Sequence, residues 1–220
     1  MSGRIAAGVV ALLGLVLAYA GVRYGTGALV RRDAQDAFVA ESGDVAGPPA
    51  AESRTRLDQA IEASPNDAEL RELRARWLLR DALQATDPAA RRRAGAAAVA
   101  DFRAALAQRP QWPYAWSGLA AAASFAGEDA APAARAALRF GPQERRVAAE
   151  LAELWMRDVR VAPVVVPAWT RMLFEQPAYW IDRADRAGRG ATACADASLP
   201  EAARARCVEL GWLTAAGPQG

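Results

Sequence analysis

Histidine is absent from this sequence, and lysine is absent too, so every basic side chain is an arginine. Without an imidazole there can be no Ser–His–Asp triad, no Cys–His dyad and no histidine-ligated metal. No other side chain titrates, unperturbed, between about pH 5 and 8. The two cysteines form neither a CxxC motif nor a metal-ligand spacing. The sequence therefore predicts no catalytic centre, no cofactor and no metal site.

A strong net charge is also missing, because 27 basic residues stand against 25 acidic ones. No overall field would draw the chain onto nucleic acid or an anionic substrate. The run Arg91–Arg93 lacks the aromatic and basic surroundings of a nucleic-acid site. A solvated helix face is favoured there over a site for acidic lipid or anionic polysaccharide. We therefore expect partner choice to depend on shape and on local groups.

An apolar run is present near the N-terminus. Ile5–Val22 carries no charge, and its length lies at the lower edge of the roughly 17–25 residues that cross a bilayer. The sequence therefore predicts an N-terminal transmembrane anchor over residues 1–27. Ala18–Ala20 also fits the small-x-small pattern of a signal-peptidase site, so cleavage that releases the domain stays open as an alternative.

Residues 28–51 are expected to form a juxtamembrane helix and then a linker rich in glycine and proline. Beyond them the pattern is helical, with apolar residues at three- and four-residue spacing, as in Leu57 and Ile61. The β-rich stretch Val159–Val166 is interrupted by Pro163, and we expect an extended connector there. The predicted fold class is all-α.

Three helix starts are marked by capping residues. Asn66 with Glu69, and Ser198 with Glu201, have the spacing of a capping box. Asp87 stands directly before a proline, the residue favoured at the first helical position. These starts divide the chain into short antiparallel helices.

A repeated pattern ends three of the predicted helices. A small and a large residue are followed by a proline that stops the helix, at Pro65, Pro110 and Pro142. The interval between Pro110 and Pro142 is close to the length of a tetratricopeptide repeat, about 34 residues. The interval between Pro65 and Pro110 is longer and requires an insertion. We therefore expect residues 52–158 to be antiparallel helix pairs stacked as a tetratricopeptide-like solenoid, with a concave groove for a partner.

Residues 159–220 are expected to form a helical cap, with helices over 167–174, 179–186 and 199–210. Cys194 and Cys207 lie in this region. A disulfide between them is geometrically possible if the connector runs back along the last helix. It would contribute on the order of 3 kcal/mol in the chain-entropy model. Two buried free thiols are the alternative.

The aromatic cluster at 112–116 is the most distinctive local feature. Trp116 has the position of a core residue, with an interaction surface as the alternative. Trp112 and Tyr114 flank it at a helix start, where they are candidates for either core packing or an interaction surface.

Two pairs of acidic residues are spaced for one helix face, Glu150 with Glu153 and Asp182 with Asp185. A general acid/base pair would need a cleft that shifts one pKa. Nothing nearby in the sequence indicates such a cleft. We therefore interpret both pairs as solvated helix faces.

The run Arg109–Trp116, with its Trp-Pro-Tyr-Ala-Trp core, resembles the signature of VpsP-type proteins. These are small, membrane-anchored, tetratricopeptide-like proteins associated with bacterial exopolysaccharide biosynthesis. The likeness extends in pattern over Glu52–Leu210, where Arg206 and Cys207 follow Cys194. It implies a non-enzymatic accessory role, in which the chain holds proteins of polysaccharide synthesis or export together at the inner membrane.

The membrane side and the partner class have competing interpretations. Arg23, Arg31 and Arg32 follow the apolar run, and the positive-inside rule alone would place the domain in the cytoplasm. The cysteine pair and the resemblance favour a periplasmic domain, which is our expectation. The competing function is a general periplasmic assembly factor for envelope or cytochrome proteins.

Overall fold

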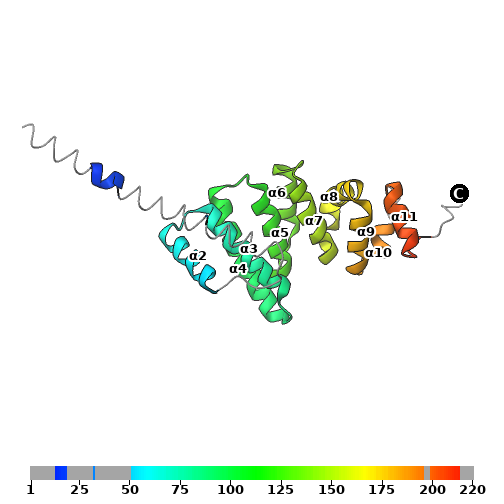
Figure 1. Cartoon of the computed structure of the whole chain (residues 1–220), viewed down its shortest axis with the longest axis horizontal. Helices are drawn as coiled ribbons and strands as arrows, with labels where there is room; N and C mark the ends of the chain where they lie inside the picture. Colours follow the sequence, from blue (N-terminus) through cyan, green and yellow to red (C-terminus); the bar gives the residue numbers. More distant parts are fainter. Residues whose placement is uncertain (1–12, 19–31, 33–50, 196–198, 214–220) are drawn as a thin grey trace, which may run out of the picture.

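The computed structural model describes residues 13–18, 32, 51–195 and 199–213. Within these ranges the chain is helical and has no strand, which confirms the all-α class. The elements, coloured from cyan to red in Figure 1, are α2 (Ala51–Ala63), α3 (Ala68–Gln84), α4 (Pro88–Gln108), α5 (Pro113–Ala126), α6 (Ala131–Phe140), α7 (Arg145–Arg157), the 3-10 turn η1 (Val159–Val161), α8 (Ala162–Glu175), α9 (Pro177–Arg186), α10 (Gly190–Cys194) and α11 (Glu201–Glu209).

The predicted anchor lies largely outside the described residues. Within it, residues 13–18 are helical and exposed. In the part of the chain that the structure describes, no helix combines the length and apolar character needed to cross a bilayer. Of the predicted juxtamembrane helix and linker, only Arg32 and Ala51 are described.

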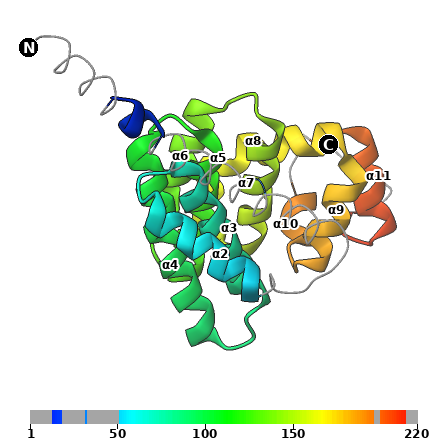
Figure 2. The same cartoon turned by 60° about the vertical axis from the view of Figure 1, so that its left-hand side comes forward.

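The helices pack in pairs and form two layers. Consecutive helices contact one another from α3 through α6, and α7 packs on α8. Contacts between alternate helices then build the layers, because α5 touches both α3 and α7 while α6 touches α8. The stack progresses along the long axis of the molecule, and α9, α10 and α11 group together at its far end (Figures 1 and 2).

Local sequence sets the helix starts, with one correction. Asp87 caps α4 and is followed by a proline in the first turn, as predicted. The cap of α3 is Asp67 and not Asn66, so that prediction was wrong by one residue. The Asp67 carboxylate accepts hydrogen bonds from the backbone N–H groups of Glu69 and Leu70. A carboxylate also stabilises the positive end of the helix dipole, which an amide does not.

The extended connector predicted at Val159–Val166 is wrong, because η1 and the start of α8 occupy this stretch. Pro163 lies in the first turn of α8, where the missing N–H removes no helical hydrogen bond. The Asp158 carboxylate accepts the backbone N–H of Arg160 and the hydroxyl of Ser124, which fixes the turn before the helix. Pro163 therefore starts this helix and does not break it.

The cap contains one helix more than predicted. The short α10 was not expected, and α8 begins earlier than residue 167. The predicted cap residue Ser198 lies outside the described residues, and the helix that follows begins after Pro200. Glycine at position 211 ends this region in the left-handed conformation, with φ of 78°.

Small residues allow the helices to approach closely. Gly118 of α5 lies beneath the ring of Phe102 from α4, so that a Cβ atom at Gly118 would overlap the ring. At Gly95, a Cβ atom would lie 2.8 Å from the backbone nitrogen of Ala126. Phe102 is fully buried and cannot move aside without disturbing the core. The contact between α4 and α5 therefore depends on glycine.

We predict that Gly118→Ala destabilises the chain by up to about 2 kcal/mol. Overpacking costs about 1–3 kcal/mol, and the better helix propensity of alanine offsets roughly 1 kcal/mol of it. Urea unfolding measures the change. In the double variant with Phe102→Leu, the cost of Gly118→Ala should shrink, since the clashing ring is gone. A cost of Gly118→Ala that Phe102→Leu leaves unchanged would show that the ring is not the obstacle.

Candidate functional site

Trp112 lies at the start of α5, where it is 39% exposed. Its indole N–H donates to the Glu72 carboxylate of α3 at 2.9 Å. The Arg109 guanidinium lies 5.8 Å from the centre of the indole, and the Tyr114 ring meets it edge-on at 5.3 Å. The exposed indole is therefore held from three sides.

Tyr114 points toward α7. Its hydroxyl donates to the Glu144 carboxylate, and this hydrogen bond raises the pKa of the phenol. The Arg146 guanidinium lies 5.5 Å from the centre of the ring, within the range of a cation–π contact. Tyr114 thus links the start of α5 to the first turn of α7.

Trp116 is held by contacts with Pro110 and Phe140. It is half-buried, and its indole N–H donates to the backbone oxygen of Pro110 at 2.8 Å. Its ring stacks on Phe140 at the end of α6, with centroids 6.4 Å apart. Of the three aromatics named by the sequence, Trp112 is therefore exposed, while Tyr114 and Trp116 are partly buried and pack against the core.

Arg76 of α3 connects the residues of this surface through hydrogen bonds and ion pairs. Its guanidinium donates to the carboxylates of Glu72, at 2.9 Å, and Glu150, at 3.2 Å, and to the backbone oxygen of Tyr114, at 3.1 Å. The Glu150 carboxylate also accepts the hydroxyl of Ser117. Arg76 thus contacts residues of all three helices, and its side chain is only 12% exposed.

We call this surface the α3–α5–α7 face. It comprises Glu72, Arg76, Trp112, Tyr114, Glu144, Arg146 and Glu150. Most of its polar atoms bond within the face, so the side chains are fixed before any partner arrives. Sequence reasoning found the two aromatics and weighed Glu150 only as half of an acidic pair. Glu72 with Arg76, and Arg146 with Glu150, have the i,i+4 spacing of ordinary ion pairs on a helix surface. Their contacts with the other helices join residues that are distant in the chain, and no local pattern predicts those.

Glu150 and Glu153 are engaged in ion pairs with different arginines. Glu150 accepts from Arg76 and from Arg146 on the α3–α5–α7 face. Glu153 pairs with Arg157 and Arg183. The two carboxylates therefore serve different ion pairs. Among the described residues, no three acidic or cysteine side chains converge in a group that could hold a metal ion.

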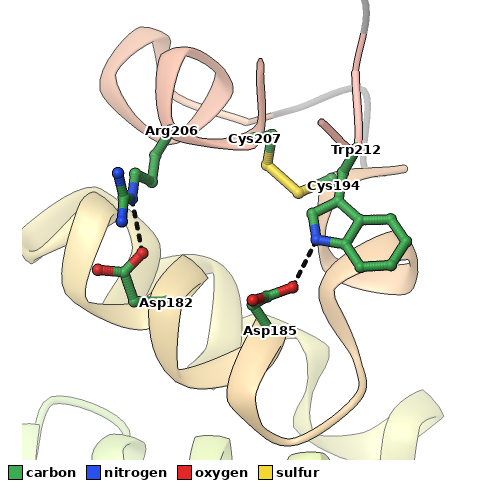
Figure 3. Close-up of a disulfide and its surroundings, with 6 residues drawn as sticks. All are labelled: Asp182, Asp185, Cys194, Arg206, Cys207 and Trp212. Atoms are coloured by element: carbon green, nitrogen blue, oxygen red, sulfur yellow. Dashed lines mark hydrogen bonds and ion pairs between the residues drawn. A yellow bond between two sulfur atoms is a disulfide. The ribbon is translucent and has the colours of Figure 1, made fainter. Parts of the chain in front are cut away.

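The other acidic pair anchors the C-terminal cap. The Asp182 carboxylate accepts from Arg206 at 2.6 Å, and Asp185 accepts the indole N–H of Trp212 at 2.6 Å (Figure 3). Beside them a disulfide joins Cys194 to Cys207, with a Cα–Cα distance of 5.8 Å. Of the two alternatives for the cysteines, the structure has the bonded one.

Comparison with known proteins gives no match to a family model, to a curated protein or to a solved structure. Functional inference for this chain therefore depends on the geometry described above and on the sequence pattern. The geometry and the sequence pattern both indicate the α3–α5–α7 face, with the exposed indole of Trp112.

We predict that Arg76→Met destabilises the chain by about 2–3 kcal/mol. The substitution keeps most of the apolar stem but leaves the carboxylate of Glu72 partly buried and without its cation. Arg56→Met is the control, because the ion pair of Arg56 with Glu52 is exposed and should contribute less than about 0.5 kcal/mol. The midpoint of urea unfolding measures both. Equal shifts for the two variants would contradict the role given to Arg76.

Proposed function

We propose that this chain is a non-catalytic interaction protein that binds a partner protein on the α3–α5–α7 face. The observation that carries the proposal is the exposed Trp112 indole held rigidly by Glu72, Arg109 and Tyr114. Aromatic side chains dominate the binding energy of many interfaces. A side chain that is ordered in advance loses little conformational entropy on binding, which favours affinity.

The arrangement of the helices supports a tetratricopeptide-like solenoid. In such stacks the first helices of successive pairs line one side and the second helices line the other. The contacts of α5 with α3 and α7, and of α6 with α8, have this alternation. Trp112, Arg76 and Glu150 lie on the layer of first helices. That layer lines the concave side of a solenoid, where a partner segment binds.

The proposed setting is the periplasmic side of a bacterial inner membrane, with residues 5–22 as the anchor. The disulfide between Cys194 and Cys207 supports it, because disulfides persist in oxidising compartments. The resemblance of Arg109–Trp116 to VpsP-type proteins supports partners from exopolysaccharide synthesis or export. The protein would then act as an accessory scaffold and not as an enzyme.

We predict that Trp112→Ala lowers partner recovery by about tenfold or more, which is the effect of losing a central aromatic at an interface. The tagged full-length chain is purified from detergent-solubilised host membranes, and bound proteins are quantified by mass spectrometry. Tyr179→Ala is the control, since Tyr179 is another exposed aromatic, 49% accessible, on α9.

The identity of the recovered proteins tests the setting. Glycosyltransferase, polymerase or exporter subunits lost with Trp112→Ala and kept with Tyr179→Ala would support the proposal. Apo-cytochromes or outer-membrane clients would favour the assembly-factor interpretation instead. Deletion of the chain in its host should reduce the yield or length of exopolysaccharide, and unchanged polysaccharide would count against the accessory role.

A further inference from the structure

The last helix has a small apolar contact area. Of the nine residues of α11, Ala203 and Cys207 are the buried ones. The helix packs on α9 and α10 and lies at the end of the stack. Burial of an alanine side chain contributes far less than burial of a leucine or phenylalanine. Apolar packing alone therefore holds α11 weakly.

The disulfide supplies the strongest attachment of α11. Cys207 of α11 bonds to Cys194 at the end of α10, and the two residues are 0% and 2% exposed. Apolar contacts of the flanking residues add to it, because Leu199 is buried and Leu210 and Leu213 pack, partly buried, against the core. The remaining ties are polar and accessible to water. Arg206, with its side chain 34% exposed, pairs with Asp182 of α9, and pairs this exposed contribute little.

Trp212 closes the cap over this bond. Gly211 adopts a φ of 78°, which reverses the chain and lets the Trp212 backbone N–H donate to the oxygen of Cys207 at 2.9 Å. The indole lies against Gly190, where a Cβ atom would overlap it, and donates to Asp185. Figure 3 shows the indole beside the disulfide, on the side of Cys194. Trp212 therefore covers one approach to the sulfur atoms.

We propose that residues 199–213 form a redox-controlled latch, in which the Cys194–Cys207 bond keeps α11 docked and Trp212 controls access to the bond. An external dithiol is the reductant. One of its thiolates attacks a sulfur of the disulfide, and the other cysteine leaves as a thiolate. The second thiolate of the reductant then resolves the mixed disulfide. The reductant ends as a disulfide, and Cys194 and Cys207 end as two thiols that carry one proton each.

Release of α11 changes the surface of α9. Asp182 loses Arg206, and Asp185 loses the indole N–H of Trp212. The two carboxylates then stand three residues apart on one helix without those partners. The redox state of the two cysteines thus determines whether the carboxylates of Asp182 and Asp185 keep Arg206 and Trp212 as partners.

Limited proteolysis of the full chain tests the latch. Arg204 lies within α11, and trypsin cleaves a helix only after it opens locally. In the oxidised chain cleavage at Arg204 should be slow. After reduction by dithiothreitol it should rise about a hundredfold, which is the effect expected for a loop of this size. Arg135, an exposed residue of α6, is the internal control and should keep its rate.

Two outcomes would overturn the latch. One is a rate of cleavage at Arg204 that rises by less than about threefold after complete reduction. The other is an equal rise at Arg135, which would indicate global unfolding. The variant Cys194→Ala with Cys207→Ala separates redox from packing. It should be cleaved at Arg204 as fast as the reduced chain, with or without dithiothreitol, and a response to dithiothreitol in this variant would also overturn the proposal.

Trp212→Ala tests control of access. When both proteins start folded and oxidised, dithiothreitol should reduce the disulfide of this variant about tenfold faster than that of the wild type. Alkylation of the new thiols and mass spectrometry follow the reaction. Leu83→Ala, at an exposed leucine of α3 toward the other end of the stack, should keep the wild-type rate. Reduction of Trp212→Ala at the wild-type rate would remove the gating role from Trp212.

Discussion

The close approach of α4 and α5 is the contact on which the rest of the structure depends. It exists because Gly118 leaves room for the ring of Phe102 and Gly95 leaves room for the backbone at Ala126. Alanines fill most of the buried positions of α5, so its neighbours also approach closely. Because the buried side chains of α5 are small, side chains of α3 can also reach those of α7 across it. Arg76 and Glu150 meet across α5 for this reason.

Much of the fold could be predicted from the sequence because its signals are local. Apolar spacing and prolines after Ile61, Leu106 and Leu138 identify helices that stop before a turn, and the structure has α2, α4 and α6 ending there. Asp87 with its following proline marked a start that the structure has. The failures are also local. In the sequence, Pro163 interrupts a β-rich stretch and so indicates an extended connector, whereas its position in the first turn of α8 makes it a helix starter.

Only part of the candidate site could be predicted from the sequence. Trp112 and Tyr114 stand out as a short aromatic cluster, but their partners Glu72 and Glu144 lie 40 and 30 positions away. No periodicity links such distant residues, and only the packing of α3 and α7 on α5 brings them together. For the cysteines, chain geometry allowed a bond without requiring one. The packing of α9, α10 and α11 decides it, because that packing accompanies a Cα–Cα distance of 5.8 Å between the two cysteines.

The central claim is that the α3–α5–α7 face binds a partner protein. Site-specific photo-crosslinking in the living host tests it most directly, with a photoreactive residue at Gln111, which is exposed beside Trp112, or at Arg135, which is exposed on α6. We expect one discrete crosslinked protein from polysaccharide synthesis or export at position 111 and none at position 135. Equal crosslinking at the two positions, or crosslinking at 135 alone, would contradict it.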